Sequence, residues 1–241
     1  MTNEGVREYF NRTAASFSAN YRHADEFEER RLVWRRHIDE ALNHLGSDTL
    51  CLDVGCGDGA LSRMVAERGV RTIGIDQSSE MLALARRFAE QTRLAQWLEF
   101  VEGSVPFQRD LYDRFEGQVG AILCSSVLEY VDDHQRVLRK FHELLEPGGW
   151  LIVSVPNRES IYRLGERIRK RMALVGDSYL RHQRSQFSAG SFKSTLQGLG
   201  FQVRADEYFA LPLHRHSSRV LGRCRSKRLA TLYLVALQKN T

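Results

Sequence analysis

Residues 50–59 read Leu-Cys-Leu-Asp-Val-Gly-Cys-Gly-Asp-Gly, and most of the expected fold follows from this stretch. Its apolar start, interrupted by Asp53 and closed by three alternating glycines, predicts a buried parallel strand that enters a tight turn. Residues 60–68 have the composition of a helix, and a second strand over residues 71–75 leads to Asp76. This unit consists of a strand, a turn, a helix and a second strand, with an acid at the carboxyl end of the second strand. It is the arrangement that binds the ribose of a nucleoside-containing cofactor.

The charges around the turn indicate which cofactor it is. A dinucleotide would bring a pyrophosphate to the glycine turn, which should then avoid fixed negative charge. Asp53 precedes the turn, Asp58 lies within it, and no Lys or Arg occurs between His44 and Arg63. These carboxylates would repel a phosphate and suit a ligand that carries an ammonium or a sulfonium. S-adenosylmethionine fits, with its amino acid near the turn and its ribose hydroxyls on Asp76.

At these residues the sequence resembles the class I S-adenosylmethionine-dependent methyltransferases, whose glycine-rich motif is matched by residues 52–59. Two further runs are similar to that family: the Asp-x-Ser-x-x-Met pattern of residues 76–81 and the Leu-Leu-Glu-Pro-Gly-Gly run of residues 144–149. The resemblance, together with the charges, implies a set of cofactor-binding residues. They are Tyr21, Asp53, Gly55, Gly57, Asp76, Gln77, Met81, Ser104 and Ser125.

The resemblance also implies the architecture. We expect an α/β fold with a Rossmann-like, seven-stranded, mostly parallel sheet, helices on both faces and an antiparallel last strand. We expect one domain over residues 1–241, in four parts. These are N-terminal helices and a lid over 1–45, a cofactor-binding core over 46–157, an inserted substrate cover over 158–200, and closing strands with a basic insertion over 201–241. In the lid, Tyr21 is expected to approach the methionine end of the cofactor.

Composition predicts an ordinary soluble enzyme. The chain of 241 residues has no stretch of 18 uninterrupted apolar residues and no apolar segment at its N-terminus, so we expect a cytoplasmic protein. The four cysteines show no metal-ligand spacing and are expected to be free thiols. The ubiquinone-pathway O-methyltransferases resemble the stretch around Glu129 but commonly read Glu-His where this chain has Glu129-Tyr130. With Ser126 and Tyr130 in place of ligand-capable side chains, we expect no metal site and a metal-free methyl transfer.

Positive charge gathers late in the chain. The net charge is +5, and most of the excess Lys and Arg follows residue 150. Residues 158–175 form an expected amphipathic helix with arginines around an apolar stripe. This asymmetry is typical of a protein with an anionic partner, such as a membrane surface at the inner face, and equally of a solvated basic surface. Nucleic acid is a less favoured partner, because no Asn/Asp-Pro-Pro-Tyr/Phe run occurs.

The reaction expected is an in-line methyl transfer to a hydroxyl of a small-molecule acceptor. A hydroxyl must lose its proton, and a histidine with a pKa near neutrality suits that task. His182 is the favoured base, because it lies in the expected cover, while His23, His214 and His216 are alternatives. Glu129 and Tyr130 follow the fourth strand, where open parallel sheets place their ligands, and are expected to face the pocket. A lipid or lipid-linked acceptor at a membrane surface is the alternative.

Overall fold

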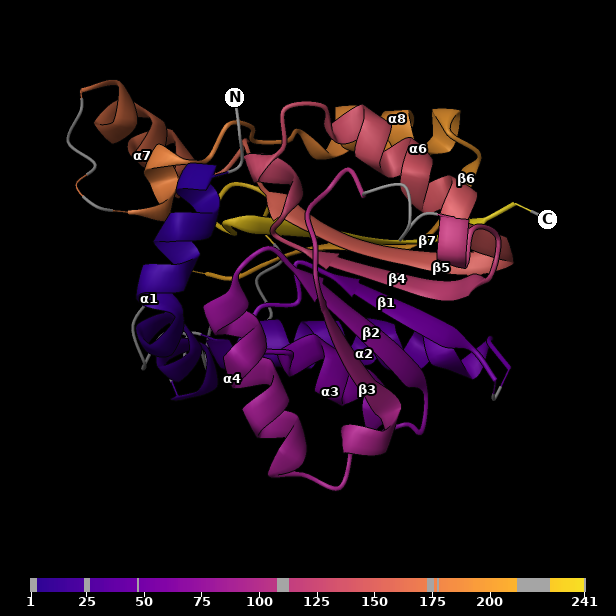
Figure 1. The fold of residues 1–241 in the computed structure, drawn as a ribbon. Helices are drawn as coiled ribbons and strands as arrows, with labels where there is room; N and C mark the ends of the chain where they lie inside the picture. Colours follow the sequence, from indigo (N-terminus) through magenta and orange to yellow (C-terminus); the bar gives the residue numbers. More distant parts are fainter. Residues whose placement is uncertain are drawn as a thin grey trace.

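The computed structural model describes residues 4–23, 27–46, 48–107, 113–172, 176, 178–211 and 226–240. A single seven-stranded sheet crosses this part of the chain in the order β3-β2-β1-β4-β5-β7-β6 (Figure 1). The pairs from β3 across to β5 are parallel, and β7 runs antiparallel to both of its neighbours. The predicted α/β fold with a mostly parallel sheet and an antiparallel last strand is confirmed.

The elements follow one another in the chain as the sequence predicts. The strands are β1 (Leu50–Val54), β2 (Arg71–Asp76), β3 (Leu98–Glu102), β4 (Val119–Ser125), β5 (Leu145–Pro156), β6 (Phe201–Phe209) and β7 (Leu232–Lys239). The helices are α1 (Glu4–His23), α2 (Glu28–Asn43), α3 (Ala60–Ala66), α4 (Ser79–Glu90), α6 (His134–Leu144), α7 (Ile161–Arg171) and α8 (Ala189–Gly198). Single 3-10 turns are η2 (Ala95–Trp97), η3 (Leu128–Tyr130) and η4 (Tyr179–Arg181).

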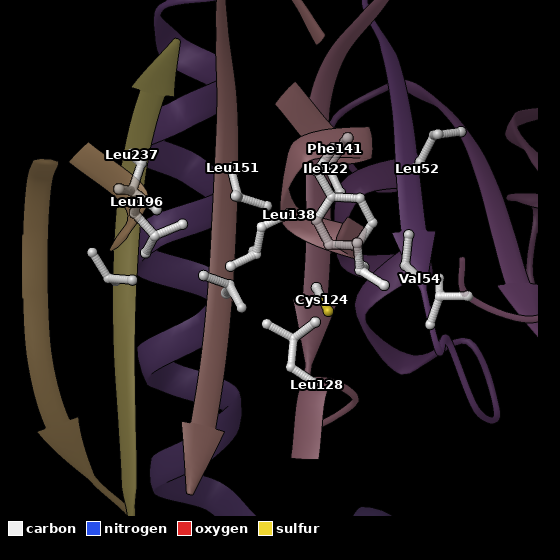
Figure 2. Close-up of a cluster of buried hydrophobic side chains, with 14 of the residues drawn as sticks. Leu52, Val54, Ile122, Cys124, Leu128, Leu138, Phe141, Leu151, Leu196 and Leu237 are labelled. Atoms are coloured by element: carbon white, nitrogen blue, oxygen red, sulfur yellow. The ribbon is translucent and has the colours of Figure 1, made fainter. Parts of the chain in front are cut away.

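Helices cover both faces of the sheet, because successive residues of a fully buried strand point to opposite sides. In β5, Leu151 packs in a cluster with Phe141 of α6 and Leu196 of α8 (Figure 2). The next residue, Ile152, belongs to the cluster on the other face, with Trp34 of α2. Helix α1 packs against α4 at one side of these layers and leaves the carboxyl ends of β1, β2 and β4 next to its inner face.

The main difference from the expected elements lies at the start of β5. The sequence predicts a helix over residues 132–145 that the Glu-Pro-Gly-Gly run of residues 146–149 ends, followed by a strand over residues 150–155. Helix α6 ends at Leu144 as this predicts within one residue, but β5 already begins at Leu145. Leu145 pairs with Val119 of β4, and the register then shifts before Trp150 pairs with Ala121. The extra residues are accommodated by this irregularity, which turn-forming residues favour. The expected basic insertion falls mostly on residues 212–225, outside the described residues.

Two expectations about composition can be compared with the described residues. Cys51, Cys56 and Cys124 are buried free thiols, while Cys224 lies outside the described part. Among the helices described, none has the length and apolar character needed to cross a membrane.

Candidate functional site

A cavity of about 270 Å³ opens at the carboxyl ends of β1, β2 and β4. Here the strand order reverses between β1 and β4, which is the point where open parallel sheets bind ligands. Its walls come from α1, the turn after β1, the tip of β2 and the loops after β3 and β4, with α7 and η4 at the far end. The described cavity therefore has a nucleotide-type end against the glycine turn and a second end against the inserted helix.

The glycine turn is fixed by the tip of β2. Gly55 N and Cys56 N both donate to the carbonyl oxygen of Ile75, at 2.7 and 3.1 Å. Gly55 and Gly57 have φ of +71° and +53°, which side chains rarely adopt. A Cβ at Gly55 would lie 2.2 Å from Val127 Cγ2, whereas a Cβ at Gly57 would meet nothing within 4 Å. Gly57 thus exposes its backbone to the cavity, and the methyl group of an alanine at this position would occupy part of the cavity.

Asp76 holds the turn and faces the cavity at the same time. Its Oδ2 accepts from Gly57 N and its Oδ1 from Ser78 N, both at 2.9 Å. Burial raises the pKa of Asp76, and the backbone N–H groups of Ser78, Gly57 and Gln77 counter that rise. Each carboxylate oxygen has a second lone pair, so the oriented carboxylate can also accept from two neighbouring hydroxyls. This is the chemistry a ribose requires.

The acid at the end of β1 has no positively charged partner among the described residues. Asp53 is 1% exposed; Ser62 Oγ donates to its Oδ2 at 2.6 Å, and its Oδ1 has no hydrogen-bond partner among the described residues. Burial raises the pKa of Asp53 to about 7, the bonds from Ser62 lower it, and Asp76 and Asp58 raise it further. A buried carboxyl oxygen without a partner is costly, and a bound ammonium group would both satisfy and ionise it.

Arg30 of α2 supplies the opposite charge at the same end of the cavity. Its guanidinium lies over the rings of Tyr21 and Phe27, at 5.7 and 5.3 Å from their centroids, and its buried Nε has no partner within the described residues. Its Nη2 donates a long hydrogen bond of 3.4 Å to Ser126 Oγ. A guanidinium whose N–H groups are not all used in hydrogen bonds can donate to a carboxylate. Arg30 and Asp53 together therefore suit the two charged ends of a free amino acid.

Helix α1 covers this end like a lid. Ser18 Oγ donates to Asp58 Oδ2 at 2.5 Å, and Asn11 Oδ1 accepts from Ser78 Oγ at 2.7 Å. The helix is thereby bonded both to the glycine turn and to the start of α4. Its inner face adds Phe17 and the largely buried Tyr21 to the cavity wall. Phe17 and Tyr21 therefore add aromatic surface to the end of the cavity that contains the charged groups.

The far end of the cavity is built around Glu129. This side chain is 3% exposed, its Oε2 has no hydrogen-bond partner in the described residues, and it lines the cavity beside Tyr130. Burial raises the pKa of Glu129 to about 7, although its own backbone N–H and the cations Arg163 and Arg30 oppose that rise. The backbone carbonyl of Glu129 accepts from Arg184 N at 2.7 Å, which fixes η3 to the inserted segment. The carboxyl group is therefore held in place with one oxygen available to a ligand.

Arg163 reaches the same end from α7. It is buried, its Nε donates to the carbonyl oxygen of Thr231 at 3.1 Å, and its Nη1 donates to Glu166 Oε2 at 2.7 Å. Tyr179 of η4 stands beside it and is 37% exposed at the edge of the cavity. Burial raises the pKa of Tyr130 well above its ordinary value, and Glu129 and Tyr179 raise it further. The inserted segment thus contributes an arginine and one phenol to the wall, and Tyr130 of η3 contributes a second phenol.

Comparison with known proteins identifies the family to which this fold belongs. A family model described as a methyltransferase domain matches residues 27–206. The chain belongs to this family. The cofactor of these enzymes, S-adenosylmethionine, carries an ammonium, a carboxylate and a ribose.

Curated relatives agree over the core. A ubiquinone biosynthesis O-methyltransferase of Erwinia tasmaniensis is 35% identical over 129 residues, which is 54% of this chain and 48% of that protein. One from Chromobacterium violaceum is 30% identical over 174 residues, 62% of this chain and 67% of the relative. The chain spans about half the length of several such relatives.

Solved structures show the same fold. The magnesium protoporphyrin IX methyltransferase of Synechocystis PCC 6803, solved with bound S-adenosylhomocysteine, superposes with a TM-score of 0.71 at 16% identity, over 99% of this chain and all of that one. A methyltransferase from Thermotoga maritima, described as a possible histamine N-methyltransferase, gives 0.63 at 16% identity, over 98% of this chain and 99% of that one. At this identity the likeness concerns the fold alone.

In this member of the methyltransferase family, the nine residues predicted to bind the cofactor gather around one cavity. All of them line it: Tyr21, Asp53, Gly55, Gly57, Asp76, Gln77, Met81, Ser104 and Ser125. Glu129 and Tyr130 line it too. Arg30 and Arg163 were not predicted as cavity residues. Arg163 could have been suspected from its position opposite the apolar stripe of its helix, whereas nothing in the sequence separates Arg30 from the other arginines around it.

His182 lies elsewhere. Its ring packs 5.6 Å from the ring of Tyr9, and its edge is 3.3 Å from the position a Cβ would take at Gly5. It stands at the first turns of α1 and is not part of the cavity wall. The side chain of His23 and the whole of His214 and His216 lie outside the described residues. No group of three His, Cys, Asp or Glu side chains gathers as metal ligands within the described ranges.

Proposed function

We propose that this methyltransferase transfers a methyl group from S-adenosylmethionine to a hydroxyl of a small organic molecule, with Glu129 as the base. The observation that carries the proposal is the buried carboxyl of Glu129, which faces the cavity with one unpartnered oxygen and a pKa of about 7. A base works best when its pKa lies near the working pH. The O-methyltransferase names of the relatives support a hydroxyl acceptor.

The cofactor end would be organised by charge. When bound, S-adenosylmethionine supplies a methyl group on a positively charged sulfur that leaves as a neutral thioether. Asp53 would hold the ammonium, Arg30 the carboxylate and Asp76 the ribose hydroxyls, while Met81 packs on the adenine. Since the methyl group is already activated, the protein's main contribution is alignment, which can supply about 7–11 kcal/mol.

The acceptor end would place and deprotonate the hydroxyl. Phe10 and Tyr130, whose rings meet edge to face at 5.9 Å, form an aromatic wall against which a flat or apolar acceptor can lie. The acceptor's O–H would donate to Glu129 Oε2, and the proton would pass to that oxygen as the new C–O bond forms. Burial makes the protonated form of Glu129 stable, so the product state is well accommodated.

His182 has no such access in the structure. Its ring packs on the side of α1 near Gly5 and Tyr9, outside the cavity wall, so the sequence-based assignment of the base to His182 gains no support from its position. Glu129 lies inside that wall. We therefore assign the proton transfer to Glu129.

The test is transfer of a labelled methyl group to a panel of phenols and to fractionated cell extract. We expect label in product that is released as methyl iodide by hydroiodic acid, which cleaves methyl ethers. Glu129→Gln should reduce kcat at least 100-fold and leave the affinity for S-adenosylhomocysteine unchanged, since general-base catalysis is typically worth about 10²–10⁴-fold. The kcat of the wild type should rise with pH through about 7, where Glu129 loses its proton.

The matched control is His182→Gln, which should keep its activity. Full activity of Glu129→Gln combined with loss in His182→Gln would refute the assignment of the base. Label that survives hydroiodic acid would refute the hydroxyl acceptor.

A further inference from the structure

The apolar side chains of helix α7 face solvent instead of the protein interior. Its apolar residues recur at helical spacing and face solvent: Ile161 is 53% exposed, Leu164 48%, Ile168 50%, and Met172 at its C-cap 63%. They are half of the large hydrophobic side chains that the described residues leave exposed. Figure 1 shows α7 at the periphery of the molecule beside α1, away from the sheet. A contiguous apolar stripe of this kind marks a surface that something covers.

The opposite face of α7 is charged and bonded to the protein. Arg163 is anchored to the carbonyl of Thr231, and Arg167 Nη1 donates to the carbonyl of Arg158 and to Gln186 Oε1 at 2.9 and 2.7 Å. Lys170 Nζ donates to the carbonyl of Gln183. Rolling the helix to bury its apolar stripe would break all of these bonds and leave charges buried without partners. The outward orientation is therefore built into the fold.

The surroundings of the stripe are basic. Arg158, Arg169, Arg171 and Arg181 are exposed around it. Beside it lies a groove of about 500 Å³ between α7 and α8, whose wall includes Arg158, Arg167, Lys170 and Arg184. At the same groove, Ser188 precedes α8 and its side chain makes no capping bond to that helix. Cationic side chains with an uncapped helix start are suited to phosphate.

We propose that α7 docks on an anionic phospholipid membrane, with its four exposed apolar side chains among the acyl chains and the adjacent basic groove against the headgroup phosphates. An apolar stripe rimmed by Arg and Lys is the pattern of a helix that lies in a membrane interface. A second copy of the chain is a poorer occupant, because it would bring two sets of arginines face to face.

The docked face adjoins the acceptor end of the site. Arg163 lines the cavity from the inner side of α7, and the partly exposed Tyr179 lines it from the next element. Docking would place the edge of the cavity at the membrane surface, within reach of an acceptor dissolved there. This inference goes beyond the proposed function and does not depend on its correctness, because membrane binding is measured without catalysis.

The test is flotation of the full chain with vesicles of phosphatidylcholine alone and with 30 mol% phosphatidylglycerol. We expect binding to the anionic vesicles that weakens as salt is raised. The double variant Leu164→Glu/Ile168→Glu should bind at least tenfold more weakly. Leu32→Glu, at an exposed leucine of α2, is the matched control and should bind like the wild type. Affinity for S-adenosylhomocysteine, measured on each variant, reports that the fold is intact.

A second variant reports membrane insertion directly, without loss of an apolar side chain from the stripe. Ile168→Trp places an indole on the stripe, and its fluorescence should shift to the blue with anionic vesicles and be quenched by brominated acyl chains. Absence of both changes in a folded protein would overturn the proposal. Unchanged vesicle binding of the Leu164→Glu/Ile168→Glu variant would also overturn it. The same holds if the wild type does not bind vesicles and instead forms a dimer that is lost in this variant.

Discussion

Replacing Glu129 with glutamine should stabilise the protein at alkaline pH. The pKa of Glu129 is about 7 in the fold, against 4.5 for an ordinary glutamate. Between these values the unfolded chain loses the proton that the folded chain keeps, so this group makes the free energy of unfolding fall as pH rises. A difference of about 2.5 pKa units corresponds to about 3 kcal/mol, and the whole loss is present above pH 7. Glutamine has nearly the same shape and no charge, so it avoids this cost.

The measurement is urea unfolding of the wild type and Glu129→Gln at pH 5 and pH 8. We expect the variant to exceed the wild type by about 3 kcal/mol at pH 8 and by less than about 1 kcal/mol at pH 5, with equal m-values. Glu90→Gln, at an exposed position on α4, is the control, and its difference in stability from the wild type should be about the same at the two pH values. An advantage of Glu129→Gln over the wild type that is no larger at pH 8 than at pH 5 would refute a neutral, buried Glu129.

Two further predictions concern the cofactor end. Gly57→Ala should fold with a free energy of unfolding lowered by only about 1 kcal/mol, and it should lose most of its affinity for S-adenosylhomocysteine. Gly55→Ala should lower the melting temperature sharply, because its Cβ would lie 2.2 Å from Val127 Cγ2. Equal melting temperatures of the two variants would contradict this prediction. Asp76→Asn should weaken the binding of S-adenosylhomocysteine, measured by calorimetry, roughly 10- to 100-fold, because hydrogen bonds to a charged acceptor contribute about 1.5–3 kcal/mol. The control is Glu102→Gln on the adjacent strand. A dissociation constant of Asp76→Asn within twofold of that control would contradict the ribose assignment.

Local signals in the sequence were enough to predict which residues line the cavity at the glycine turn. The glycines at 55 and 57 mark a turn that only positive φ allows, and Asp53 and Asp76 follow from their places at the ends of apolar runs. These features lie close together in the chain and are shaped by neighbouring residues. The same local rules misjudged the run before Trp150. Turn-forming residues there are part of β5, because pairing of Leu145 with Val119 extends the strand past them.

The sheet, the glycine turn and the acids that face the cavity can be predicted from the sequence alone, because periodicity and glycine spacing act over a few residues. The end of the cavity beside α7 could not be predicted in this way. The stripe of Ile161, Leu164 and Ile168 defines a face of α7, but its direction depends on what Arg163 can bond to on the sheet side. Likewise, Glu129 is an ordinary glutamate until burial raises its pKa. Burial and orientation are set by contacts between distant segments, which no pattern along the chain records.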